Sequence, residues 1–76
     1  MMIFLMHYDP AQGGIVELTR FNDGERPLAD KARLELEMRL NREKIEHEVV
    51  LLEASSEAAL RRTHRRYFEN RHELTT

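Results

Sequence analysis

The 76-residue sequence contains no cysteine. This absence excludes disulfide bonds and thiolate metal sites, two devices that stabilise many small domains. A chain of this length forms one domain and buries only about 60% of the surface that its unfolded form exposes. Ordering a chain costs about 1.5 kcal/mol per residue, so the net stability of so small a domain lies near zero. Efficient packing or a partner chain must therefore supply the remaining stability.

The sequence also lacks long apolar runs and a strong charge of either sign. Its opening segment, 1–6, is apolar but too short for the core of a signal peptide. No stretch approaches the roughly 20 apolar residues of a membrane span, and we expect no membrane association. The net charge of -2 gives no overall attraction to nucleic acid or to anionic lipid. Together with the absence of cysteine, these features predict a cytoplasmic protein.

The motifs of common catalytic and cofactor sites are missing as well. No serine lies between glycines, and Gly13-Gly14 lacks the lysine and the helix that follow a phosphate-binding loop. No two histidines stand four apart on a predicted helix, so the common helical metal pair is absent. His64 falls on an apolar stripe and is expected to be a packing residue. We therefore predict no cofactor, no metal and no catalytic residue.

The residues that are present predict an alternation of strands and helices. Apolar runs rich in strand formers are separated by turn sequences such as DPAQGG, and the segments rich in Ala, Leu, Glu, Lys and Arg favour helices. Leu34–Leu40 also alternates with period two, but propensity and length favour a helix. The chain 1–76 is thus expected to form one small domain, with strands 2–8, 15–21 and 48–54, helices 27–45 and 56–70, and a frayed tail 71–76.

These elements predict an α+β fold, a two-layer β-β-α-β-α domain. We expect a three-stranded mixed sheet with two helices packed on one face, since helix 27–45 forms a crossover between two parallel strands. The last strand can lie beside 15–21 or beside 2–8. The second order is preferred because it places the strand 2–8, which is apolar on both sides, in the middle of the sheet.

Apolar side chains exceed what one layer of helices can cover. Strands 2–8 and 48–54 are apolar on both faces, and helix 27–45 carries a second apolar stripe opposite its first. An apolar surface of this kind marks an interface, and we expect a two-fold homodimer. In the alternative, helix 56–70 and the tail cover the second stripe. The candidate interface residues are Leu34, Met38, Ile45, Val50 and Leu52.

A basic cluster lies on the predicted helix 56–70. It contains Arg61, Arg62, Arg65 and Arg66, and arginines four apart can follow a phosphate backbone. The same charges also suit a solvated face near the negative end of the helix dipole. Nucleic-acid binding through these four residues is therefore one hypothesis, although the near-neutral net charge and the lack of a known motif do not favour it.

Three functions from different classes remain open. The leading hypothesis is a non-enzymatic interaction or regulatory module that works through its dimer surface or an exposed sheet edge, with a further protein as a candidate partner. The second is the nucleic-acid binder. The third is a small-molecule site or enzyme at a subunit cleft, for which His7, Tyr8 and Asp9 are the candidates, because a histidine beside a carboxylate is the minimum of an acid–base pair.

Overall fold

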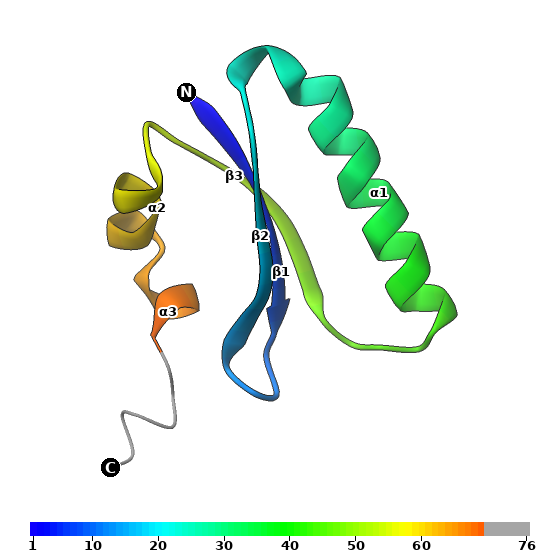
Figure 1. Cartoon of the computed structure of the whole chain (residues 1–76). Coiled ribbons are helices and arrows are strands. Elements are labelled where there is room, and N and C mark those ends of the chain that lie inside the picture. Colours follow the sequence, from blue (N-terminus) through cyan, green and yellow to red (C-terminus); the bar gives the residue numbers. More distant parts are fainter. Residues whose placement is uncertain (70–76) are drawn as a thin grey trace.

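The computed structural model of the chain describes residues 1–69 (Figure 1). Its elements follow the predicted order closely, but the last helix is divided in two and a short 3-10 turn precedes the long helix. The elements are β1 (Met2–Asp9), β2 (Gly14–Phe21), the 3-10 turn η1 (Asp23–Glu25), α1 (Arg26–Arg42), β3 (Glu48–Ala54), α2 (Glu57–Thr63) and α3 (Arg65–Phe68).

The three strands form one sheet in the order β2-β1-β3, which is the preferred of the two predicted orders. Both neighbouring pairs are antiparallel, so the prediction of a mixed sheet is wrong. The crossover through α1 does give β2 and β3 the same direction. They are not neighbours, however, because β1 lies between them and runs the opposite way.

The helices cover both faces of this sheet, and the prediction that they share one face is wrong. Figure 1 shows α1 on one side of the strands and α2 with α3 on the other. The reason lies in β1, which is buried on both faces: Ile3 and Leu5 point toward α1, whereas Phe4 and Met6 point toward the short helices. The apolar surplus of the sheet faces is thus covered within the chain.

The core on the side of the short helices forms two adjoining clusters. Phe4 packs with Ala54 and Leu60, and these side chains are almost completely buried. Tyr8 meets Tyr67 edge to face, with ring centroids 4.9 Å apart. Burial of Leu60 from α2 and of Tyr67 from α3 holds these short helices, which would be unstable alone, against the sheet.

The segment with two competing periodicities is helical, as predicted, and α1 ends at Arg42. The stripe that contains Ala29 and Leu40 faces the sheet. Lys44 takes a left-handed conformation with φ 57°. Its N–H donates to the Asn41 carbonyl, and the N–H of Ile45 donates to the Leu40 carbonyl. This is a Schellman ending, and it stops the helix before the predicted end at Ile45.

The second predicted helix, 56–70, begins as expected and then breaks. Ser56 caps α2, since its Oγ accepts a hydrogen bond from the N–H of Ala59 at 3.1 Å. His64 leaves the helical conformation with φ -124° and ψ 50°, and α3 resumes beyond it. The predicted frayed tail, 71–76, lies outside the described residues. Among residues 1–69, no helix is long and apolar enough to cross a membrane.

Candidate interaction site

The two edges of the sheet differ in how they are protected. β2 carries an irregularity opposite His7 and Tyr8, where Val16 has no partner on β1, and it also carries Glu17 and Arg20. Bulges and charges are the usual devices that keep an edge strand from pairing with another chain. β2 is therefore a guarded edge.

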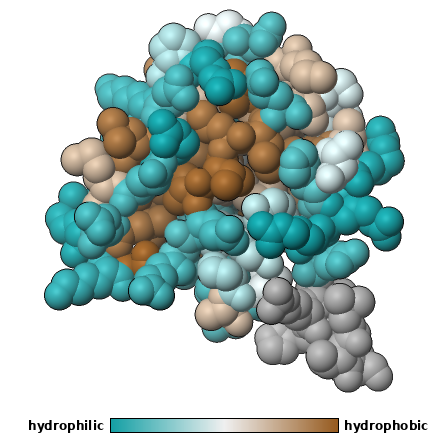
Figure 2. Space-filling model, turned by 180° about the vertical axis from the view of Figure 1, so that it is seen from behind, coloured by the Kyte–Doolittle hydropathy of each residue, from teal (hydrophilic) through white to brown (hydrophobic). Residues whose placement is uncertain are grey.

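β3 has neither device along its middle. Its four central residues, 49–52, are Val-Val-Leu-Leu, all half-buried, and its register with β1 is regular. Within the described part of the chain, no strand pairs with its outer edge. Figure 2 shows an apolar area in the middle of the rear face of the molecule, bordered by hydrophilic side chains. A regular, apolar and unpaired edge is the kind of surface to which a further strand adds.

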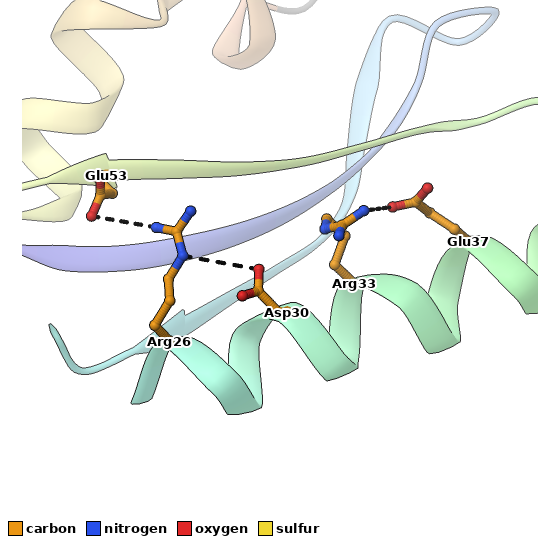
Figure 3. Close-up of polar contacts among 5 residues, drawn as sticks. All are labelled: Arg26, Asp30, Arg33, Glu37 and Glu53. Carbon is orange, nitrogen blue, oxygen red and sulfur yellow. Dashed lines mark hydrogen bonds and ion pairs between the residues drawn. The ribbon is translucent and has the colours of Figure 1, made fainter. Parts of the chain in front are cut away.

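The only acidic residues of β3 stand at its ends, and each has a basic neighbour. Glu53 Oε1 lies 3.4 Å from Arg26 Nη1 of α1. Figure 3 shows these two side chains pointing toward each other. Glu48 Oε1 lies 3.8 Å from Arg66 Nη2 of α3. Because both carboxylates are paired within the chain, they oppose an incoming strand less than free carboxylates would.

A row of alternating charges runs along the side of α1 next to β3. It consists of Arg26, Asp30, Arg33 and Glu37, which we call the charge row. Arg26 Nε lies 3.9 Å from Asp30 Oδ1, and Arg33 pairs with Glu37 (Figure 3). The row is on the β3 side because Arg26 reaches Glu53, and because Glu37 lines a groove of about 260 Å³ that Val49 of β3 also lines.

The predicted interface residues fall into two groups that the fold separates. Val50 and Leu52 point into the core beneath the short helices. Leu34 and Met38 are 53% and 57% exposed on α1, and Ile45, at 37%, follows the end of that helix. By its angular position on the helix, Leu34 borders the charge row, whereas Met38 points away from the sheet. The second stripe of α1 is therefore exposed within residues 1–69.

The structure adds His47 to the predicted pair of His7 and Asp9. His7 Nε2 lies 2.8 Å from His47 Nδ1, and His47 Nε2 lies 3.5 Å from Asp9 Oδ2. Burial, followed by the proximity of His47 and Arg39, lowers the pKa of His7 below its usual value. Sequence reasoning missed His47, although the antiparallel register that pairs His7 with Val49 places residue 47 next to Asp9 when it is extended by two residues.

The arrangement of these histidines does not form a binding pocket around His7. His7 is 5% exposed, and the groove that His47 lines does not include His7 in its walls. Tyr8 points to the opposite face, where it packs on Tyr67. The three predicted residues therefore do not converge on one cavity. Within the described residues, no group of three metal-binding side chains is placed to hold an ion.

The four predicted arginines are divided by the break at His64. Arg61 pairs with Glu57 at 3.1 Å and lies over the ring of Phe68. Arg66 lies over the ring of Tyr67 and donates a hydrogen bond to its hydroxyl. Arg62 and Arg65 are also exposed. Two of the four guanidinium groups are thus engaged in packing α2 and α3, and the cluster does not form one continuous helical face.

As a candidate interaction site, the geometry therefore favours the edge of β3 and the adjoining charge row over the histidines and the arginines. Both surfaces are partly accessible to solvent, both are contributed by well-formed elements, and they lie side by side. Comparison with known proteins adds no assignment to this surface: no family model, no curated protein and no solved structure matches the chain.

Proposed function

We propose that this protein is a non-enzymatic interaction module that works as a homodimer, joined edge to edge through β3. The observation that carries the proposal is the regular apolar edge of β3, left unpaired within residues 1–69 while the opposite edge is guarded. Two such edges, paired antiparallel around a two-fold axis, give one six-stranded sheet in which every central backbone group gains a partner.

The energetics of a small domain support association. The chain has no cysteine, and within residues 1–69 no cluster of ligands can hold a structural metal. Strand pairing adds backbone hydrogen bonds and covers the half-buried side chains of β3, and burial of apolar surface stabilises by about 25 cal/mol per Å². A partner chain is thus a source of the stability that so short a chain lacks.

The other two functions receive less support from the structure. A phosphate-binding face requires several free cations, and Arg61 and Arg66 are engaged with carboxylates and aromatic rings. An acid–base site requires a cavity beside the titrating group, and His7 is packed away from the groove next to it.

The proposal is tested by solution mass and by amide hydrogen exchange. We expect light scattering to show a dimer that dissociates on dilution over about a hundredfold range, following mass action. As the dimer forms, the amides of 49–52 that point away from β1 should exchange more slowly. The outer amides of β2 provide the internal control and should not change. A monomer at all concentrations, or a dimer with unchanged exchange in β3, would show the proposal to be wrong.

A further inference from the structure

We infer that the charge row of α1 selects a second copy of this chain as the partner of β3 and fixes one register between the two copies. This inference rests on the proposed function, because it concerns the partner of the same edge. It goes further because it assigns two roles to four surface side chains. They favour a second copy of this chain over other strands, and they favour one alignment of the two β3 strands over the alternatives.

The first step is geometrical. A two-fold axis perpendicular to the sheet keeps each face on its own side, so the α1 helices of both subunits lie on the same face and run antiparallel. Paired strands are about 4.8 Å apart. Because α1 lies mainly over β1 and β3, the two helix axes come to about 10 Å apart, close to the usual 8–10 Å of packed helices. The sides of α1 that face each other carry the charge row.

The second step is the sequence of charges. Along α1 the row reads positive, negative, positive, negative at Arg26, Asp30, Arg33 and Glu37. An antiparallel copy reads in reverse. Arg26 therefore meets Glu37 of the partner subunit, and Asp30 meets Arg33 of the partner subunit. All four contacts across the axis join opposite charges, and the row is complementary to itself.

The third step is that helix and strand share the same centre of symmetry. The pairs in the row are symmetric about the point between Lys31 and Ala32. Arg26 contacts Glu53 at one end of β3, and Leu40 lines a groove with Val49 toward the other end. The centre of the row thus lies over the middle of β3, where Leu51 meets Leu51 of the partner subunit. One position of the partner subunit therefore allows both the pairing of the β3 strands and the contacts of the charge row.

The fourth step concerns other registers. The side chains of β3 keep to their own faces of the sheet only if the pairing shifts by two residues at a time. Such a shift moves the partner by about 6.6 Å along the strand, which corresponds to roughly four residues of a helix. A slip in one direction places Asp30 near Glu37 of the partner subunit, and a slip in the other places Arg26 near Arg33 of the partner subunit. Like charges then face each other, so the row disfavours the slipped alignments.

Charge reversal with rescue tests this inference. Arg33→Glu and Asp30→Arg each create like-charged contacts across the axis, and each should raise the dissociation constant of the dimer about tenfold. An equimolar mixture of the two variants restores opposite charges at both contacts, and it should form heterodimers with nearly wild-type affinity. High salt should reduce both effects, because these side chains are half-exposed.

The matched control is Lys31→Glu. It makes the same change of charge on α1 as Arg33→Glu, but at a position 74% exposed on the other side of the helix, and it should leave the dissociation constant unchanged. Circular dichroism confirms that each variant is folded. If the wild type is a dimer and both reversals dimerise as tightly, the charge row does not face its copy and this inference fails, while the proposed function stands. If the wild type is a monomer, the proposed function itself fails.

Discussion

At the scale of single residues, His7 is a buried histidine that contacts His47, which in turn contacts Asp9. Its burial affects its protonation, although His7 does not line the groove beside it. A buried imidazole can receive a hydrogen bond or donate one, but taking up a proton requires a charge in a poorly solvated place. His47 and Arg39 add positive charge nearby, while Glu17 and Asp9 act in the opposite direction. The net result favours the neutral form of His7 in the folded protein.

This lowered pKa predicts a loss of stability in mild acid. The unfolded chain takes up the proton near pH 6.5, before the folded chain does. The contribution of His7 to the free energy of unfolding is therefore fully present above that pH, and it is lost as the pH drops toward the lower pKa of the folded state. Urea denaturation between about pH 7.5 and 5.5 should show this fall in the wild type and a smaller fall in His7→Gln.

Comparison of these two proteins isolates His7, because His47 and His64 are present in both. Equal losses in the wild type and in His7→Gln would mean that the burial of His7 does not govern the response to acid.

At the scale of elements, the ends of the helices were harder to predict than their existence. The strong helix formers and the length of α1 identified it as a helix despite the competing period of two. Its end depends on Lys44 in a left-handed conformation that glycine usually takes, and nothing in the type of residue signals this. The break at His64 was likewise missed, because no proline or glycine stands there.

The cap of α2 can be tested by substitution. Ser56→Ala removes the hydroxyl that accepts the N–H of Ala59, and it should lower the free energy of unfolding by about 1 kcal/mol. Ser55→Ala is a matched control at the preceding exposed position, and it should change the stability little. The measurement is urea denaturation at one protein concentration; equal effects of the two substitutions would contradict the role of Ser56.

The arrangement of the elements was predicted in part. Strand 2–8 is apolar on both sides, and this feature correctly placed it in the centre of the sheet. The prediction that both helices cover one face was wrong, because Phe4 and Met6 on the opposite face of β1 are covered by Leu60 and Tyr67 of the short helices. The charge row was not identified, because it emerges only when the fold shows which side of α1 lies next to β3.

At the scale of the whole molecule, the principal extents of 42 × 33 × 12 Å describe a thin body of three layers. Its narrow dimension corresponds to the width of a three-stranded sheet. A thin body has much surface for its volume, which makes stability depend strongly on whatever covers that surface. If the proposed dimer forms, folding and association are coupled.

This coupling predicts that thermal stability depends on protein concentration. A tenfold increase in concentration should raise the Tm by about 3–5 °C, because the dimer gains by mass action and a domain of this size is sensitive to small free energies. Arg33→Glu, measured over the same range, should melt at a lower temperature than the wild type. Differential scanning calorimetry provides the measurement, and a Tm that is independent of concentration would contradict the coupling.

The irregularity at Val16 in β2 has a consequence for how far such an assembly can extend. A sheet with two receptive edges adds one chain after another and grows into a fibre. Under the proposed function, β3 is the one edge that accepts a further strand, because β2 is irregular at Val16 and carries charged residues. In the proposed dimer, the two copies pair through β3, and β2 forms both outer edges of the combined sheet. If the proposed dimer forms, the unpaired Val16 would limit the assembly to two chains and prevent growth into an open polymer.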